Sequence, residues 1–356
     1  MPAALINYAY NLANLFRRER FLRPLAVTYY VTTQCNLNCA YCEDFGARRN
    51  AQNTPPLPLE ETLHVLRVIR TATDQVILTG GEPLLHPQVD ELVARSRREL
   101  GFRGITMLTN ASLLHDHEAV LPHLTRLVVS LDSTDPAFWS SIVNVPLHTT
   151  HRILENIRSY AGLQSQYGYR LILNCVITPQ TLPGARAVLQ FSRENNILVS
   201  FSPQAVMNWP NYDLLVSAEY KDFLSEIIAQ KQCGAPVLGS LVYLRTLRNF
   251  HPYACYPTLV PRVLPAGELV YPCRPIQKAN NGHGGQPCNL REVRDWNEAV
   301  QRATAEFGPP PMVCSSCFQQ CFAEPSLMQA RPFDWLAEWL RFPASRDASL
   351  VTFAPG

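Results

Sequence analysis

Three cysteines near the N-terminus have a spacing that could hold an iron–sulfur cluster. They are Cys35, Cys39 and Cys42, separated by three and by two residues. Three thiolates on one short loop can cap three irons of a cubane [4Fe-4S] cluster, which usually takes four cysteine ligands. No fourth cysteine is close in the sequence, so one iron would be left open to a small molecule. Such a cluster could act as a catalyst and not only as an electron carrier.

A zinc site is the main alternative for these three cysteines. Structural zinc takes four ligands in a tetrahedral arrangement, so it would need a further Cys or His close by. The nearest histidine in the sequence is His64. The pattern therefore favours iron and sulfide over zinc at this loop.

The composition indicates a large folded protein that binds metal. The chain has 356 residues, of which 47% are hydrophobic, enough for a barrel and a small further domain. Its formal net charge is +2 without a long basic tract, and no nucleic-acid partner is expected. Eleven cysteines without a secretory signal point to cytoplasmic metal binding and not to disulfides. No apolar run reaches the ~18 residues that span a bilayer, so we expect a soluble, cytoplasmic protein.

Apolar, β-branched runs alternate with helical patterns over the first two thirds of the chain. Such an alternation predicts parallel βα units, which form an α/β fold whose working residues lie at the strands' carboxyl ends. We expect a partial (β/α)6 TIM-like barrel with a small Cys-rich C-terminal domain. The expected strands are 25–32, 75–79, 105–109, 126–131, 170–178 and 197–202, and the expected helices are 58–72, 87–100, 114–123, 149–163 and 183–195.

The first residues predict an amphipathic helix over 5–20. Its apolar residues share one face and are followed by arginines at positions 17, 18 and 20. Two interpretations stay open. The helix packs on its own domain, or it approaches a membrane surface or a lipid, which would give a weak membrane-surface association. The apolar residues of this face are Leu5, Tyr8, Leu12, Leu15 and Phe16.

Polar motifs follow the expected strands. The second strand ends in Gly80-Gly81-Glu82-Pro83, where two glycines allow the backbone to approach a ligand closely. Taken alone, the glycines would suit an ordinary tight turn, and Ser130 with Asp132 would suit a helix cap. The other polar positions at strand ends are Asn110, Ser130, Asp132 and Asn174.

Together these motifs resemble the radical S-adenosylmethionine (SAM) enzymes. The resemblance covers about residues 25–203 and rests on the cysteine loop, with an aromatic residue before its third cysteine, and on the Gly-Gly-Glu-Pro turn. It implies that Cys35, Cys39 and Cys42 ligate a [4Fe-4S] cluster. The methionyl amino and carboxylate groups of SAM would chelate the fourth iron.

The same resemblance implies a set of SAM contacts. Gly80, Gly81 and Glu82 would contact the amino group, and Pro83 would shape the turn. Tyr41 would lie near the adenine. The remaining contacts, to the ribose or the methionyl carboxylate, would come from Ser130 and Asp132, joined by Asn110 and Asn174.

The resemblance also implies the chemistry of an oxidoreductase. An electron from the reduced cluster would cleave SAM, and the resulting 5′-deoxyadenosyl radical would abstract hydrogen from an unactivated C–H bond. The substrate is unknown and could be a peptide, a sugar, or a lipid-like or tetrapyrrole molecule. The expected electron donor is a flavodoxin- or ferredoxin-type protein. No catalytic acid or base can be named from the sequence, and a non-enzymatic Fe–S or zinc-binding scaffold is the alternative from another class.

A second cysteine set lies in the C-terminal third. Cys255 and Cys273 flank an expected hairpin with Gly267 in its turn. The set resembles the SPASM or twitch extension of the family and implies one auxiliary [4Fe-4S] cluster. Five candidates compete for four ligand places, and a zinc knuckle is the alternative. The last three candidates are Cys314, Cys317 and Cys321, and the sequence does not decide among them.

The remaining cysteines receive simpler interpretations. Cys175 lies in an apolar strand and is expected in the core. Cys233 and Cys288 are expected to be free thiols, although Cys288 could also be a remote ligand. The expected segments are an N-terminal amphipathic helix (1–24), the radical SAM barrel (25–203), a connecting helical region (204–250), the auxiliary-cluster domain (251–330) and a C-terminal tail (331–356).

Overall fold

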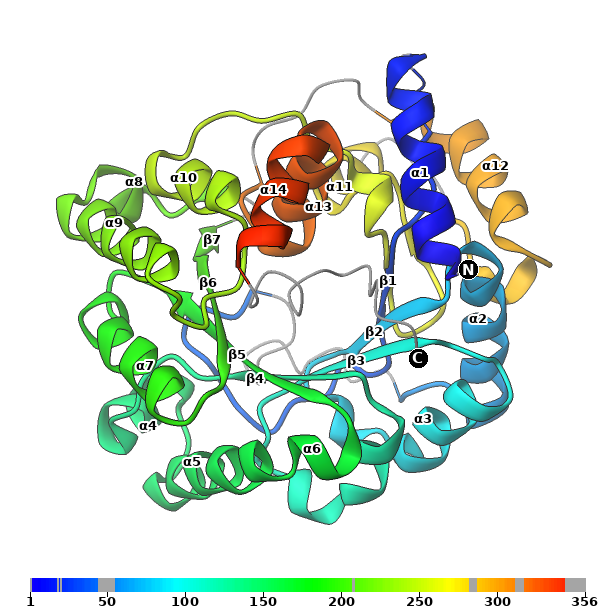
Figure 1. Cartoon of the computed structure of the whole chain (residues 1–356). Helices are drawn as coiled ribbons and strands as arrows, with labels where there is room; N and C mark the ends of the chain where they lie inside the picture. The colour runs from blue at the N-terminus through cyan, green and yellow to red at the C-terminus, as the bar shows by residue number, and fades with distance from the viewer. Residues whose placement is uncertain are drawn as a thin grey trace.

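Eight strands curve into one open sheet in the order β10-β9-β1-β2-β3-β4-β5-β6 (Figure 1). The computed structural model describes residues 2–17, 19, 21–43, 55–206, 209–281, 287–310 and 317–342. Strands β6 and β10 form the two edges, so the predicted partial barrel is confirmed and is not closed. The parallel strands are β1 (Val27–Tyr30), β2 (Gln75–Thr79), β3 (Gly104–Thr109), β4 (Arg126–Ser130), β5 (Arg170–Ile177) and β6 (Leu198–Pro203).

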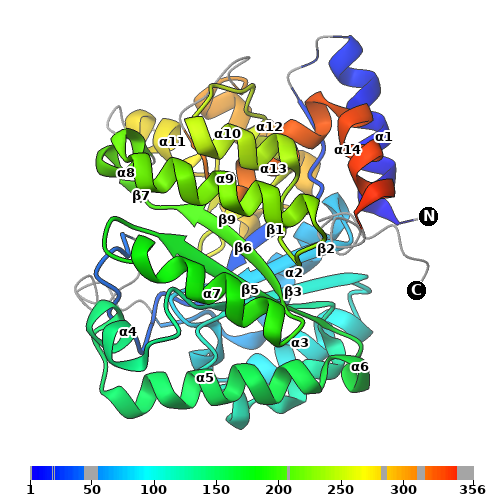
Figure 2. The ribbon, with the colours of Figure 1, turned by 60° about the vertical axis from the view of Figure 1, so that its left-hand side comes forward.

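Helices cover the outer face of this sheet (Figures 1 and 2). Four of the five predicted helices are present as α-helices. The fifth, 114–123, consists of two 3-10 helices, η3 (Leu114–Asp116) and η4 (Glu118–His123), and Pro122 inside η4 has no N–H to give to an α-helix. The helices of this region are α2 (Leu59–Ala72), η2 (Pro83–Leu85), α3 (Val89–Arg98), α4 (Pro136–Val143), α5 (Leu147–Gly162), α6 (Gln164–Tyr167) and α7 (Leu182–Glu194).

Successive side chains along each strand point alternately to the outer and the inner face of the sheet. Residues such as Leu78, Met107 and Leu127 belong to the main hydrophobic core. Their neighbours along the strands, such as Thr79 and Thr106, line a cavity on the inner face. This follows from the two-residue period of a strand, and it gives the barrel a partly polar interior.

The C-terminal hairpin extends the barrel sheet. Strand β9 (Arg262–Val263) pairs in parallel with β1, and β10 (Leu269–Val270) pairs with β9 in the antiparallel sense. Gly267 in the connection has a φ of 89°, a conformation that favours glycine. The other elements here are η5 (Pro257–Leu259), α11 (Arg274–Asn281), η6 (Leu290–Glu292), α12 (Trp296–Phe307), α13 (Gln320–Ala330) and α14 (Pro332–Arg341), the last lying in the segment expected to be a tail.

The connecting region between the barrel and the hairpin is helical, with one small ribbon. Its helices pack beside β6 at one edge of the sheet (Figure 2). The elements are β7 (Ala205–Val206), β8 (Trp209–Pro210), α8 (Tyr212–Val216), α9 (Ala218–Gln232) and α10 (Leu241–Asn249).

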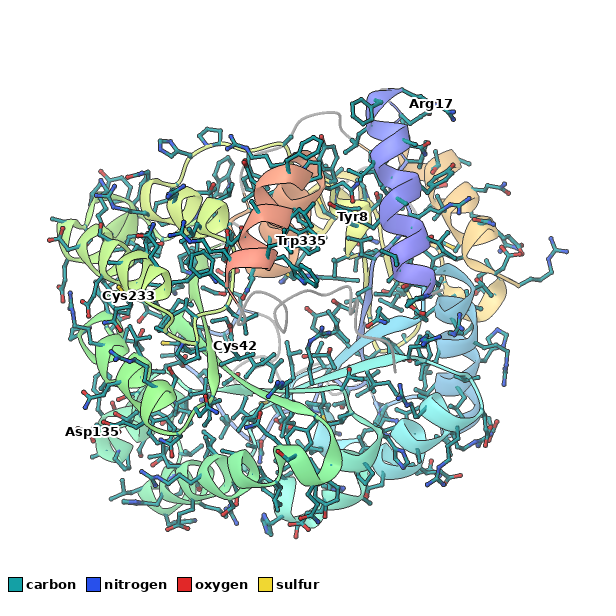
Figure 3. The ribbon with its side chains drawn as sticks, viewed as in Figure 1. Tyr8, Arg17, Cys42, Asp135, Cys233 and Trp335 are labelled. Carbon is teal, nitrogen blue, oxygen red and sulfur yellow. The ribbon has the colours of Figure 1, made fainter. Side chains whose placement is uncertain are left out.

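Helix α1 (Ala3–Phe16) lies beside α14, at the other end of the chain (Figures 1 and 2). It begins two residues before the predicted start and ends at Phe16. The rings of Tyr8 and Trp335 meet between the two helices, with centroids 5.9 Å apart (Figure 3). Within the described ranges, no helix combines the length and the apolar character needed to cross a membrane.

Candidate active site

The cysteine loop follows β1 and places three partly buried thiols in the interior of the molecule. Figure 3 shows Cys42 inside the ring of helices, whereas Asp135 and Cys233 lie at its periphery. Burial raises the pKa of Cys35 to about 11, and the carboxylate of Glu82 and the thiol of Cys42 add to the rise. Burial and the charge of Asp132 also raise the pKa of Cys39. A bound cation would therefore favour the thiolate forms of Cys35 and Cys39.

The two glycines after β2 hold the start of this loop by close backbone contact. Gly81 N donates to the carbonyl of Thr32 at 3.1 Å, and Glu82 N donates to the carbonyl of Gln34 at 2.7 Å. A Cβ atom on Gly81 would lie 2.2 Å from the Gln34 oxygen, and one on Gly80 would lie 2.5 Å from the Thr32 oxygen. Glycine is required at both positions because the cysteine loop is so near. The SAM contact expected of them stays a prediction.

Glu82 is fully buried, and its carboxylate joins two strand ends. One oxygen accepts hydrogen bonds from Thr109 Oγ1 at 2.7 Å and from Leu84 N at 3.0 Å. The other oxygen accepts from Asn110 N at 2.7 Å. Burial raises the pKa of Glu82 to about 7, although these hydrogen bonds oppose the rise. The next residue, Pro83, begins the 3-10 helix η2, which turns the chain.

A chain of amide and hydroxyl groups ties the cysteine loop to the end of β3. Asn110 Nδ2 donates to Asn36 Oδ1 at 2.8 Å, and Asn36 Nδ2 donates to Ser112 Oγ at 2.8 Å. Ser112 Oγ in turn donates to Asn110 Oδ1 at 2.6 Å. Sequence reasoning found Asn110 but missed Asn36 and Ser112. The sequence offered a signal for Asn36, since it lies between the predicted ligands Cys35 and Cys39.

Asp132 is buried and binds the cysteine loop through Tyr41. The hydroxyl of Tyr41 donates to one carboxylate oxygen, and Val176 N donates to the other at 2.8 Å. Burial raises the pKa of Asp132 to about 6, against the effect of both hydrogen bonds. Helix α4 is capped by Asp135, so Asp132 does not serve as that cap. Ser130 is half-buried and pairs in register with Asn174 on β5.

A cavity of about 390 Å³ lies between the barrel strands and the C-terminal segments. Of the predicted cofactor-binding residues, Tyr41 and Asn174 line it. Strand β6 and the residue after it add polar groups, and Asn174 Oδ1 accepts from Ser200 Oγ at 3.0 Å. The other polar and charged lining residues include Ser200, Ser202, Gln204, Arg126, Arg262, Arg274, Glu43 and Glu324.

Four of the auxiliary cysteines fall in the described part of the chain, and Cys314 lies outside it. Burial raises the pKa of Tyr253, and the neighbouring thiols of Cys255 and Cys317 raise it further. Arg262 Nη2 lies 3.6 Å from the sulfur of Cys321. Cys255 and Cys317 thus lie near Tyr253, and Cys317 and Cys321 lie near Arg262. Cys273 follows β10 on the hairpin that carries Arg262.

In the described residues, no three or more Cys, His, Asp or Glu side chains form a group that could hold one metal ion. Cysteines that cap a cubane cluster bind different irons, so they need not converge on one point. Cys175 is fully buried, as expected, and Cys233 is exposed. Cys288 is buried behind β10, where its carbonyl accepts from Leu269 N at 2.8 Å.

Residues 29–204 match the family model described as the radical SAM superfamily. The chain is 32% identical over 154 residues to Molybdenum cofactor biosynthesis protein 1 of Bos taurus, a match that covers 41% of this chain and 23% of that protein. It therefore spans about a quarter of the length of this curated relative. It is also 29% identical over 280 residues to GTP 3',8-cyclase of Xanthomonas axonopodis pv. citri, covering 67% and 82% of the two chains.

Two solved structures share the fold. The crystal structure of Streptococcus suis SuiB matches with a TM-score of 0.61 and 19% identity, covering 84% of this chain and 70% of that chain. A histidine-tagged anSMEcpe with bound AdoMet matches with a TM-score of 0.54 and 14% identity, covering 92% and 98%. At these identities the likeness extends to the fold alone.

Proposed function

Since this chain belongs to the radical SAM superfamily, we propose that it cleaves SAM reductively and abstracts hydrogen from a substrate held in the barrel cavity. The observation that carries this proposal is the position of the cysteine loop. Its three partly buried thiols stand next to Tyr41, whose side chain lines the cavity of about 390 Å³. A cavity of that size is in the usual range for a small-molecule site.

The residues at this place fit a [4Fe-4S] cluster and SAM. The donor set is three thiols on one loop, and burial holds the pKa values of Cys35 and Cys39 above their ordinary range. Positive iron would offset that penalty and their mutual repulsion. We assign Cys35, Cys39 and Cys42 as the cluster ligands. When bound, the cluster and SAM supply an electron transfer and a carbon radical able to abstract hydrogen.

The chain's own groups fix the loop and shape the cavity. Gly81 and Glu82 hold the loop to β2, Asn110 holds it to β3, and Asp132 holds it to β4 through Tyr41. Each contact is buried or half-buried and comes from a strand end, so the loop has little freedom to shift. Apolar lining from the strands helps to exclude water from the reacting groups.

We further propose that the substrate is a small anionic molecule, and that a nucleotide is the first to test. The cavity lining contains three arginines against two glutamates. Guanidinium groups bind phosphate and carboxylate oxygens in a bidentate manner. Relatives named GTP 3',8-cyclase match this chain over up to 67% of its length, which supports GTP as the first compound. Peptides, sugars and lipid-like or tetrapyrrole molecules should be tested as substrates after it.

An auxiliary [4Fe-4S] cluster is the second part of the proposal. Cys255, Cys273, Cys317 and Cys321 are its ligand candidates among the described residues. Cys321 lines the same cavity, so this cluster would lie near the substrate and could accept an electron from it. Iron counts of Cys314→Ala and Cys321→Ala would decide which is a ligand. We also propose a flavodoxin- or ferredoxin-type reductant and a cytoplasmic location, in which the thiols stay reduced.

The decisive experiment is anaerobic reconstitution with SAM and dithionite. We expect 5′-deoxyadenosine to form, and GTP to raise its rate above that seen with peptides or sugars. No 5′-deoxyadenosine under any condition would contradict the proposed function. Zinc without iron and sulfide in the anaerobically purified protein would favour the scaffold alternative.

A cavity-filling variant tests the location of the substrate. Val128 lines the cavity from β4, so Val128→Phe should obstruct the substrate while the cysteine loop stays intact. We expect SAM cleavage without substrate to persist and its stimulation by substrate to be lost. The matched control is Leu147→Phe, since Leu147 is 46% exposed on α5. Undiminished stimulation in Val128→Phe would place the substrate elsewhere.

A further inference from the structure

Helix α1 packs on the domain through one face that mixes apolar residues with asparagines, and its other face exposes large apolar residues. Asn7 and Asn11 are buried, and Asn7 Nδ2 donates to the carbonyls of Pro24 at 2.7 Å and Ala72 at 2.8 Å. The outer face carries Ile6, Tyr10 and Phe16, and Phe16 is 88% exposed. A helix on the surface of a water-soluble domain normally carries polar or charged residues on its exposed face. The sequence from Ala3 to Phe16 contains no charged residue that could solvate this face.

Helix α14 adds a second exposed apolar face. Phe333, Leu336 and Leu340 follow a helical spacing, and Phe333 is 83% exposed. The ring contact between Tyr8 and Trp335 joins this helix to α1. Figures 1 and 2 place both helices at the same upper end of the molecule. The exposed residues thus belong to one region.

Arginines border this region. Arg17 follows the last residue of α1 and lies at the upper edge of the molecule (Figure 3). Arg341 ends α14, Arg331 precedes it with Nη1 3.9 Å from the Asp334 carboxylate, and the Arg23 guanidinium carbon lies 3.7 Å from the centroid of the Tyr10 ring. Apolar side chains bordered by arginine match a bilayer interface, where the apolar groups enter the acyl boundary and the cations meet anionic headgroups.

We propose that the exposed faces of α1 and α14 form a surface that lies on an anionic lipid bilayer. This α1–α14 surface consists of Ile6, Tyr10, Phe16, Phe333, Leu336 and Leu340. The end of α1 extends beyond the neighbouring elements (Figure 1), and a fluid bilayer can accommodate such an uneven surface. It lies on the membrane and does not cross it, in accord with the lack of a spanning helix in the described ranges. The proposal does not depend on the radical chemistry.

The test is flotation of the full, anaerobically purified chain with lipid vesicles. One set of vesicles is phosphatidylcholine with one third phosphatidylglycerol, and the other is phosphatidylcholine alone. We expect the protein to float with the anionic vesicles, more weakly with the neutral ones, and less at high salt because salt screens the arginines. Protein that stays in the soluble fraction with both vesicles overturns the proposal.

Two variants separate the apolar and the electrostatic contributions. Phe16→Glu/Leu340→Glu should lower partition into anionic vesicles by at least about tenfold, because two exposed apolar groups are lost. Arg17→Glu/Arg341→Glu should lower it by about fivefold for each arginine, while partition into neutral vesicles stays the same. Both variants should give the circular dichroism spectrum and the rate of SAM cleavage of the unchanged protein, which would show that they remain folded.

Leu147→Glu is the matched control. Leu147 is also an exposed apolar residue, but it lies on α5 at the opposite end of the view in Figure 1. It should float like the unchanged protein. Equal flotation of Phe16→Glu/Leu340→Glu and the unchanged protein contradicts the proposal. A second result would also contradict the proposal. If the unchanged protein self-associates without vesicles and this variant does not, the surface binds a second copy of the chain and not a membrane.

Discussion

The hydroxyl of Tyr41 donates a hydrogen bond to the buried carboxylate of Asp132, so the cysteine loop and the end of β4 are joined. Because Val176 N binds the other oxygen of Asp132, β5 takes part in the same connection. The loop that carries Cys35, Cys39 and Cys42 therefore depends on strands far from it in sequence. Its geometry is a property of the whole barrel.

Replacing Tyr41 with Phe should loosen the cysteine loop without removing a cluster ligand. The variant leaves a buried carboxyl group with one donor fewer, at a cost of roughly 1–3 kcal/mol in the free energy of unfolding. We expect the rate of SAM cleavage to fall by about tenfold while the iron content is kept. Denaturant unfolding and 5′-deoxyadenosine formation measure the two effects. Tyr212→Phe, at a 71% exposed position, serves as the control and should change neither.

Gly81→Ala should displace the cysteine loop. The new Cβ atom would lie 2.2 Å from a backbone oxygen of Gln34 and 2.9 Å from the Cβ atom of Cys35. Backbone cannot move aside as a flexible side chain can, so we expect a loss of roughly 1–3 kcal/mol and of cluster binding. Absorbance of the reconstituted cluster is the measurement. Gly162→Ala is the control because nothing lies within 4 Å of its new Cβ atom, and a normal cluster in Gly81→Ala would refute this account.

Cys39→Ala should abolish SAM cleavage and spare the second cluster. One iron of the first cluster loses its ligand, whereas the C-terminal thiols are unchanged. We expect no 5′-deoxyadenosine together with residual iron–sulfur absorbance. Cys233→Ala, at an exposed position, should behave like the unchanged protein. Complete loss of iron in Cys39→Ala would argue against the auxiliary cluster.

Glu324→Gln should stabilise the protein increasingly as the pH rises. Burial raises the pKa of Glu324 from its ordinary value of 4.5 to about 7, in spite of the Ser240 N–H that donates to both carboxylate oxygens. The stability that comes from the protonated group is complete below about pH 4.5 and is lost as the pH rises through about 7. Glutamine stays neutral at every pH, so the Glu324→Gln variant keeps this stability.

We therefore expect the difference in melting temperature between Glu324→Gln and the unchanged protein to grow from about pH 4.5 to about pH 7 and to level off above that. Each kcal/mol corresponds to roughly 2–4 °C in a protein of this class. Glu82 and Asp132 titrate in the same pH range, but both proteins contain them, so their effects cancel in the difference. Glu155→Gln, at an exposed position, should show no such trend. A difference that shrinks with pH would contradict the assignment.

The strands and the cysteine loop were predictable because their signals are local. Apolar runs between helical patterns located all six barrel strands to within a few residues. The C-x3-C-x2-C loop and the Gly-Gly-Glu-Pro turn, which the sequence predicted to act together, are in contact in the structure. Other parts depend on partners distant in sequence. Glu82 bonds to Thr109 and Asn110, 27 and 28 residues further on, and no local pattern reveals that its carboxylate turns toward β3.

Helix α1 shows why apolar periodicity fails at some surfaces. The sequence placed Tyr8 and Phe16 on one apolar face, but the structure buries Tyr8 with Asn7 and Asn11 and leaves Phe16 exposed. The asparagines turn inward because carbonyls of Pro24, Ala72 and Arg23 need donors there. Helix α4 was missed for a different reason, since it is short and lies between two prolines. Asp135-Pro136 is a start signal for α4 that sequence reasoning did not use.

The parallel pairing of β9 with β1 makes the C-terminal third a structural part of the barrel. A truncated chain that stops before residue 251 would leave the backbone N–H and C=O groups of β1 without their neighbour on that side. Bare strand edges recruit other chains, so such a fragment should aggregate. The barrel of this protein is therefore not a separable module, and dissection by domain deletion would report on misassembly rather than on the role of the C-terminal cysteines.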